Sequence, residues 1–206
     1  MIEINKHMYK SYYYLLCIVV CLLPQAFILP IEASYENHVL ENLEVGILSI
    51  GLITMLYKVY IMKIKILKLF YLACGIFYLI MIARELSFGR VFYPIGVNAN
   101  GEQIFINIHQ LWYGAIVYPI IAILVMIALF LMIKTYKFAQ ADEWLCQVPR
   151  YSILMCISML FLSQVVFEKN MIISLANYAQ LLEECTEILA YCSLVAFTKD
   201  IIFKRR

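Results

Sequence analysis

Three glutamates stand in an apolar run near the C-terminal end of this sequence: Glu183, Glu184 and Glu187. If the run crosses a membrane, each unpaired charge near its centre costs about 2.5–3.5 kcal/mol. In a helix, Glu187 follows Glu184 by three residues and Glu183 by four, so all three carboxyl groups can face one groove. Their presence therefore requires a proton, a cationic partner, a metal ion or a water-filled cavity.

Other polar residues are predicted at the same depth. A helix rises about 1.5 Å per residue, which puts Glu187 about 18 Å and Glu183 about 24 Å above the inner boundary of the last run. The same count puts Glu85, on the third run, at about 25 Å. His109 directly precedes the fourth run. These residues predict a polar layer in the outer half of the membrane, to which two further runs add Gln25 and Gln164.

Carboxylates and an imidazole in one layer predict a metal centre. Zn, Mn or Fe accept such ligands, and a divalent cation would neutralise the buried charge. A metal-bound water could then act as a nucleophile, with a spare carboxylate as general base. The predicted metal ligands are Glu85, His109, Glu184 and Glu187.

Four further residues complete this predicted site. Glu183 is the candidate general base, and Ser87 is the second catalytic candidate at the mouth of the site. Arg90 is a candidate for substrate binding, because a guanidinium group holds anionic groups such as phosphate. Glu102 is the second substrate-binding candidate.

Two other interpretations of the same charges stay open. Arg84 and Arg90 could pair with Glu85 and with a glutamate of the last run, which would fix helix packing without chemistry. The carboxyl groups could also form a proton or ion path. For His109 alone, a hydrogen-bonding role at the membrane interface competes with metal ligation.

The composition predicts an integral membrane protein. Of the 206 residues, 65% are hydrophobic and only 15% are charged, whereas soluble domains carry about 25% charged residues. The mean hydropathy is +0.85. Six of the seven cysteines lie inside apolar runs, and the sequence has no CxxC pair, which excludes a zinc ribbon or thioredoxin-like motif. The basic C-terminal end is not evidence of nucleic-acid binding.

Continuous apolar runs predict an all-α fold, a polytopic membrane helix bundle. A span needs about 20 residues, and helices satisfy their own backbone hydrogen bonds in lipid. The first run is longer than the core of a cleaved signal peptide, so we expect it to be retained. Six transmembrane helices in a single integral membrane domain, residues 1–206, are predicted over about 11–30, 45–62, 66–86, 111–133, 151–168 and 174–198.

The distribution of Lys and Arg predicts the orientation. With the N-terminus inside, only three of the 16 basic residues fall outside, namely Arg84, Arg90 and Lys169. The excess of basic residues on one side follows the positive-inside rule. Both termini are therefore predicted in the cytoplasm, with the protein in the cell (inner) membrane. Two outer loops result: an acidic one over 30–44, which ends at Glu44, and a longer one over 87–110 that could fold as a lid over the site.

Three segments together resemble an uncharacterised family of bacterial multi-spanning membrane proteins. The segment Arg84-Glu85-Leu86-Ser87-Phe88-Gly89-Arg90 is similar to E-E-x-S-W-G-Q-R of that family. Asn100-Gly101-Glu102 followed by Asn107-Ile108-His109-Gln110 is similar to its G-E-x-x-x-H-N stretch, and Glu183-Glu184-Cys185-Thr186-Glu187 to its E-E-x-x-E segment. The resemblance supplies no activity. It implies that Glu85, Ser87, Glu102, His109, Glu183, Glu184 and Glu187 belong to one constellation, in which Arg84 replaces a carboxylate.

Two classes of function follow from these patterns. The first is a membrane-embedded enzyme, a metal-assisted hydrolase or transferase acting on a lipid or lipid-linked substrate at the outer face. The alternative is a non-enzymatic membrane protein, either a small transporter or channel component or an immunity or assembly partner, whose buried charges are structural ion pairs. Membrane lipids are the expected partners in both classes, and a protein partner is left open.

Overall fold

The computed structural model describes residues 13–98, 101–142 and 144–205. Asn100 and the first two residues of the first predicted span lie outside these residues, as do some of the basic residues from which the orientation is predicted, namely Lys6, Lys10 and Arg206. The described chain forms two compact units, and each is described by itself. Unit 1 comprises Met1–Ile47 and Val148–Ile201, and unit 2 comprises Leu48–Gln147 and Ile202–Arg206. The single domain remains a prediction.

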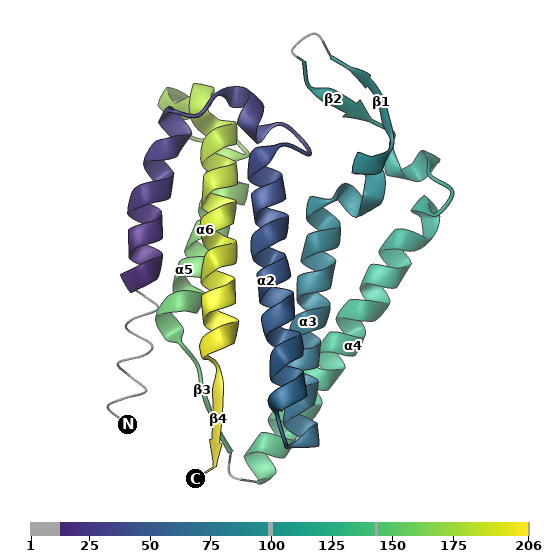
Figure 1. Cartoon of the computed structure of the whole chain (residues 1–206), viewed down its shortest axis with the longest axis vertical. Helices are drawn as coiled ribbons and strands as arrows, with labels where there is room; N and C mark the ends of the chain where they lie inside the picture. The colour runs from purple at the N-terminus through teal and green to yellow at the C-terminus, as the bar shows by residue number, and fades with distance from the viewer. Residues whose placement is uncertain (1–12, 99–100, 143, 206) are drawn as a thin grey trace. The chain divides into compact units, whose positions relative to one another are not determined.

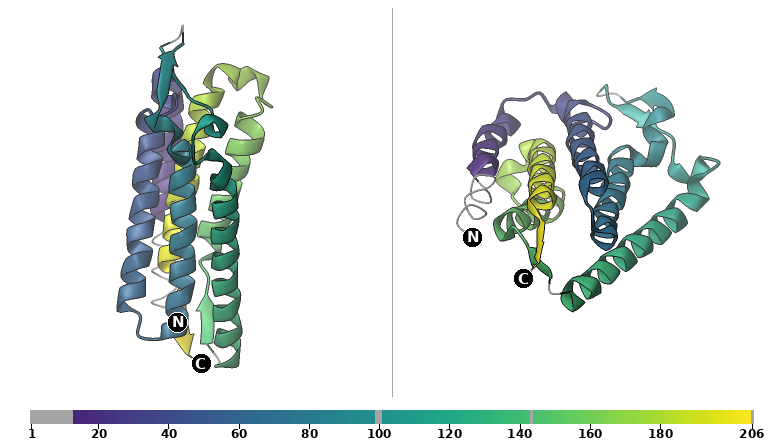
Figure 2. Two further views of the ribbon diagram at one scale, coloured as in Figure 1. Left: turned by 90° about the vertical axis from the view of Figure 1, so that its right-hand side faces the viewer. Right: turned by 60° about the horizontal axis from the view of Figure 1, so that its bottom comes forward.

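Unit 1 consists of helices. Its last helix, α6 (Ala179–Asp200), packs against α5 (Arg150–Phe161) and against the end of the first helix (Tyr13–Phe27), as Figures 1 and 2 show. The start of α2 (Val39–Ile61) also belongs to this unit. Shorter turns join these helices, namely η1 (Leu23–Phe27), η2 (Ile31–Ser34), η5 (Leu162–Phe167) and η6 (Ile173–Tyr178).

The core of unit 1 lies at one end of α6. Leu181, Leu182, Cys185 and Ile188 of α6 pack with small residues of the first helix and of η2. Gln180 at the start of α6 adds a polar contact, since its side-chain amide donates to the backbone carbonyl of Ser34 at 3.0 Å. The segment that precedes α2 is therefore held against α6.

Unit 2 contains two long antiparallel helices and two small sheets. The helices are α3 (Lys65–Glu85) and α4 (Gly114–Ala141), which lie side by side in Figure 1. Between them come η3 (Ser87–Phe92), the antiparallel hairpin β1 (Pro94–Val97) and β2 (Gln103–Phe105), and η4 (Ile108–Gln110). After α4, β3 (Trp144–Gln147) pairs antiparallel with the C-terminal strand β4 (Ile202–Arg205).

Two contacts hold α3 to its neighbours in unit 2. The buried hydroxyl of Thr135 on α4 donates to the carbonyl of Ile66 at 3.2 Å and to that of Leu131 at 2.9 Å. On the other side, Gly51 of α2 leaves room for the ring of Tyr78, which is only 2% exposed. Small residues allow such close approach between helices in membranes.

The all-helical membrane fold is confirmed, but the predicted number of spans is wrong. In the described residues, four helices are long and apolar enough to cross a membrane, namely Val39–Ile61, Lys65–Glu85, Gly114–Ala141 and Arg150–Phe167. Helices also occupy the first and last predicted spans. The first, Tyr13–Phe27, is shorter in the described chain, and α6 carries three glutamates, which lower its apolar character.

Exposed apolar side chains on these helices support the assignment to a membrane. Only 6% of the apolar window of α4 is buried inside the structure, and Phe130 and Met126 are more than 60% exposed. An aqueous surface of this kind would be unfavourable, whereas acyl chains solvate it without cost. The described chain is therefore that of a transmembrane protein.

The start of the second span differs from the predicted boundary. Its helix begins at Val39 rather than at residue 45. Glu41 lies in the first turn, where a carboxylate interacts favourably with the helix N-terminus, and it accepts a hydrogen bond from the backbone N–H of Asn37. The end of the acidic segment that predicted a loop, residues 39–44, therefore forms the start of α2, and this brings Glu44 inside a helix.

Candidate buried carboxylate site

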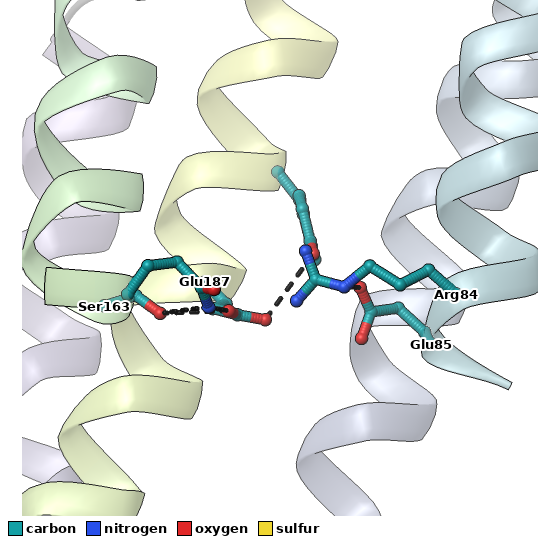
Figure 3. A network of polar contacts seen from close by, with 6 residues as sticks. Arg84, Glu85, Ser163 and Glu187 are labelled. Carbon is teal, nitrogen blue, oxygen red and sulfur yellow. Dashed lines mark hydrogen bonds and ion pairs between the residues drawn. The ribbon is translucent and has the colours of Figure 1, made fainter. Parts of the chain in front are cut away.

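A network of polar contacts in unit 1 surrounds Glu187 of α6, which is 5% exposed. Its Oε1 atom accepts a hydrogen bond from the hydroxyl of Ser163 at 2.9 Å and another from the side-chain amide of Gln164. Its Oε2 atom lies 3.5 Å from the hydroxyl of Tyr191, one turn further along α6. Figure 3 shows Ser163 and Glu187 facing each other from neighbouring helices. These hydrogen bonds fix the position of the Glu187 carboxyl group between the two helices.

The two donors on the neighbouring helix come from a wide turn. After Phe161, the α-helix continues as one turn of π-helix, η5. The backbone N–H of Glu168 donates to the carbonyl of Ser163, and that of Met171 to the carbonyl of Val166, each across five residues at 2.9 Å. In this turn, Ser163 and Gln164 both reach Glu187 although they are adjacent in sequence. Single π turns are frequent at functional sites.

Glu44 of α2 is the second buried carboxylate of unit 1. It is fully buried, and one of its carboxylate oxygens lies within 4.8 Å of one of Glu187. The sequence placed Glu44 at the end of an exposed outer loop, which is incorrect because the helix starts earlier. Two acidic side chains from α2 and α6 thus come together inside the unit, and we call them the carboxylate pair.

The chemistry open to the carboxylate pair follows from its burial and spacing. Two like charges this close repel each other, and a cationic side chain or a bound metal ion can offset that repulsion. Carboxylate oxygens are ligands for Mn and Fe as well as Zn. The hydroxyl of Ser163 and the side-chain amide of Gln164 are neutral polar groups that donate to Glu187, and the hydroxyl of Tyr191 lies 3.5 Å from it.

The other two glutamates of the cluster lie on the same helix as Glu187 but are less buried. Glu183 and Glu184 are half-buried. Thr186, between them and Glu187, donates back to the carbonyls of Leu182 at 2.8 Å and Glu183 at 2.9 Å. The helical arrangement of the three glutamates agrees with the predicted spacing, whereas Glu184 as a ligand and Glu183 as a base stay predictions.

In unit 2, the last turn of α3 holds an ion pair. Glu85 is 6% exposed, and one of its carboxylate oxygens lies 3.5 Å from Nε of Arg84, whose side chain is 46% exposed (Figure 3). This contact agrees with the interpretation in which Arg84 compensates Glu85 and fixes packing. Removing one partner of such a pair leaves a buried charge, which is costly.

Ser87 and Arg90 lie in the turn that follows α3. The backbone at Ser87, Phe88 and Gly89 has positive φ angles of 44°, 53° and 89°, a conformation that only glycine adopts without strain. Strained turns of this kind persist where surrounding contacts hold them. Here the hydroxyl of Tyr113 donates to the carbonyl of Phe88 at 3.3 Å. The turn holds Ser87 and Arg90, both half-buried, close to the end of α3.

Glu102 and His109 lie in the connection between α3 and α4. Glu102 closes the β1–β2 hairpin, because its carboxylate accepts from the amide of Asn98 at 2.8 Å, and its N–H donates to Asn98 Oδ1 at 3.0 Å. His109 lies in η4, is exposed, and its ring centroid lies 6.5 Å from that of Tyr118. In the described part of unit 2, no cluster of three potential ligands includes His109.

Three residues of the site in unit 1 were not among the predicted site residues. Glu44 was assigned to a loop, and Ser163 and Tyr191 were not considered. The sequence feature that pointed to this contact was Gln164, since the side chain of a glutamine within an apolar run must find a hydrogen-bond partner. Serine gives a weaker signal, because its hydroxyl can bond to the backbone of its own helix.

No protein-family model matches this sequence, and neither a curated protein nor a solved structure matches it. The class of protein therefore follows from the fold and its apolar helices, and it is that of a multi-pass membrane protein. The resemblance of the three segments to a bacterial membrane-protein family stays a prediction.

Proposed function

We propose that this chain is a membrane-embedded metal-dependent hydrolase or transferase acting on a lipid or lipid-linked substrate. The carboxylate pair in unit 1 carries this proposal: Glu44 and Glu187 are both buried, and their oxygens lie within 4.8 Å. A divalent cation, Zn, Mn or Fe, would neutralise both charges and serve as a Lewis acid. Glu183, half-buried one turn from Glu187, is the proposed general base.

The proposal predicts a bound metal that depends on the pair. Protein purified in mild detergent is expected to contain about one Zn, Mn or Fe per chain by elemental analysis. Glu44→Gln and Glu187→Gln should each lower the metal content at least tenfold, because an amide is a weaker ligand than a carboxylate. Glu187→Gln keeps an acceptor for Ser163 and Gln164, so the fold should persist.

Glu41→Gln is the matched control, since Glu41 lies on the same helix in its first turn. Its metal content should equal that of the wild type. Metal-free wild-type protein, with all three variants folded to the same extent, would contradict the proposal. Metal that survives in both Glu44→Gln and Glu187→Gln would exclude the pair as its site.

A second candidate function is a non-enzymatic membrane protein in which the buried charges are structural. The ion pair between Arg84 and Glu85 favours it. If this candidate function is correct, we expect Arg84→Gln and Glu85→Gln each to lower the free energy of unfolding. The double variant should lose less stability than the sum of the two single losses. The same metal analysis separates the candidates, because a structural pair needs no bound ion.

We further propose that both termini lie in the cytoplasm and that the protein lies in the cell membrane. Labelling of the native Cys146 thiol tests this orientation. This residue lies in β3, between α4 and α5, and is exposed. The other described cysteines lie within helices. A membrane-impermeant maleimide is therefore expected to label inverted vesicles and not right-side-out ones, and Cys146→Ser should abolish this signal.

The labelling rate should also depend on pH. Partial burial raises the pKa of the Cys146 thiol above its usual value, and only the thiolate reacts. Less thiolate is present near neutral pH than for an ordinary cysteine, so the rate should keep rising beyond pH 8.5. Glutathione is the control thiol for the reagent. Labelling from the outer side would contradict the proposed orientation.

A further inference from the structure

Basic side chains gather at one end of unit 2. Figure 1 shows the connection between α2 and α3 at the same end of this unit as the last turns of α4. We call the basic residues there the lysine cluster, which consists of Lys63, Lys65, Lys68, Lys134 and Lys137. All except the half-buried Lys68 are exposed. The sequence has no acidic residue over 57–70 or 131–141, and in the described part of the chain none of the five lysines has an ion-pair partner.

A contact between α3 and α4 brings the lysines of the two helices together. The hydroxyl of Thr135 on α4 donates to the carbonyl of Ile66 on α3 across 69 residues of sequence. The four lysines on these helices are one or two residues away from Thr135 or Ile66. At about 1.5 Å per residue, they lie within about 3 Å of this contact along the helix axes. The positive-inside rule accounts for the side of the membrane that lysines occupy, whereas this packing gathers them in one place.

The lengths of the two helices place the lysine cluster at the depth of lipid phosphates. α3 has 21 residues, so Lys65 and Glu85 at its two ends are about 30 Å apart. The same distance along α4 separates Gly114 from Lys134. The hydrocarbon core of a bilayer is also about 30 Å thick. Tyr136, which is 63% exposed, agrees with this depth, because tyrosine is enriched at the interface between lipid and water.

The position of two of these lysines is unfavourable unless an anion is present. Lys65 and Lys68 lie at the start of α3, whose first turn has no acidic residue and whose N-cap makes no side-chain hydrogen bond. The dipole of a helix disfavours cations near its N-terminus. The lysines of the cluster also repel one another, since like charges at short range raise the energy. A phosphate group bound among them would offset both effects.

We propose that the lysine cluster binds the headgroup phosphate of an anionic phospholipid in the adjacent leaflet. Lysine ammonium groups are phosphate binders, and clusters of about four to eight basic residues beside a transmembrane helix attract anionic lipids. The exposed apolar residues of α4 one turn further into the membrane, such as Phe130 and Ile133, are suited to contact the acyl chains of the same lipid. The proposal uses residues of unit 2 alone and is independent of the carboxylate pair.

Native mass spectrometry of the full chain in mild detergent tests the proposal. Dioleoyl phosphatidylglycerol and dioleoyl phosphatidylcholine are the probes, since they differ only in the headgroup. The wild type should bind phosphatidylglycerol more tightly, and this preference should fall as salt is added. The double variants Lys63→Gln/Lys65→Gln and Lys134→Gln/Lys137→Gln should each weaken phosphatidylglycerol binding by roughly tenfold, because each removes two charges that attract the phosphate. Binding of phosphatidylcholine should not change.

Lys169→Gln/Lys199→Gln is the matched control, because it removes two exposed lysines outside the cluster and changes the net charge equally. It should bind phosphatidylglycerol like the wild type. Equal binding of the two lipids by the wild type, or equal losses in the cluster variants and the control, would overturn the proposal. Glycerol phosphate tests the other source of the same chemistry. If it displaces phosphatidylglycerol at equal concentration, the cluster binds a soluble phosphate and the assignment to a lipid is wrong.

Discussion

Replacement of Glu187 by alanine is expected to lower the free energy of unfolding by about 3–5 kcal/mol, as for other buried polar partners that are removed one-sidedly. The substitution leaves Ser163 and Tyr191, both fully buried, and Gln164 without their shared acceptor. Each buried group without a partner costs about 1–3 kcal/mol. Thermal unfolding in detergent, followed by the loss of monodisperse protein on size exclusion, measures the effect.

Glu183→Ala is the control for this prediction, because Glu183 is on the same helix and is only half-buried. A loss of about 1 kcal/mol or less is expected there, as for partly exposed charges. Glu187→Gln should lie between the two, since it keeps one acceptor oxygen. Equal effects of Glu187→Ala and Glu183→Ala would show that the three donors do not depend on Glu187.

Gly51→Ala is expected to destabilise the protein by about 1–3 kcal/mol, the usual effect of overpacking. A Cβ atom at Gly51 would lie 2.3 Å from Cε1 of Tyr78, 2.6 Å from Cζ and 2.9 Å from Cδ1. The ring is 2% exposed and has little room to move. The same thermal measurement detects this loss as a lower midpoint.

Gly46→Ala on the same helix is the matched control, since a Cβ there meets nothing within 4 Å. Both substitutions gain about 1 kcal/mol of helix propensity, so Gly46→Ala should be neutral or stabilising while Gly51→Ala is not. A smaller residue at position 78, as in Gly51→Ala with Tyr78→Leu, should recover part of the loss through coupling between the two positions. A stabilising effect of Gly51→Ala would contradict the packing described for Tyr78.

The elements of this fold were largely predictable from the sequence because apolar length is a strong signal in membrane proteins. The third predicted span, 66–86, agrees with Lys65–Glu85 almost to the residue. The number of spans was harder to predict. A helix such as α6 satisfies its backbone hydrogen bonds whether or not its side chains are apolar. A sequence that predicts a helix therefore does not also predict that the helix crosses the membrane.

The carboxylate pair could be predicted only in part. Glu187 stood out because a charge in an apolar run is costly, but Glu44 belongs to a segment with several acidic residues, which is typical of an exposed loop. Only the early start of α2 buries it. The π turn also hides the contacts of Glu187 from the sequence, because counting in steps of three and four residues assumes an unbroken α-helix. That count does not bring both Ser163 and Gln164 to the same partner.

The unequal lengths of the spans determine where the protein and the bilayer must adapt to each other. At about 1.5 Å per residue, α4 with 28 residues is about 42 Å long, whereas the 18 residues of Arg150–Phe167 cover about 27 Å. The long helix tolerates a thick membrane by tilting or by leaving its last turns in water. The short one is accommodated by local thinning of the bilayer, by flanking side chains that extend to the interface, or by oligomerisation. The mismatch between the length of the protein and the thickness of the bilayer is therefore largest at Arg150–Phe167. A thin bilayer is the membrane in which this span distorts the lipids least.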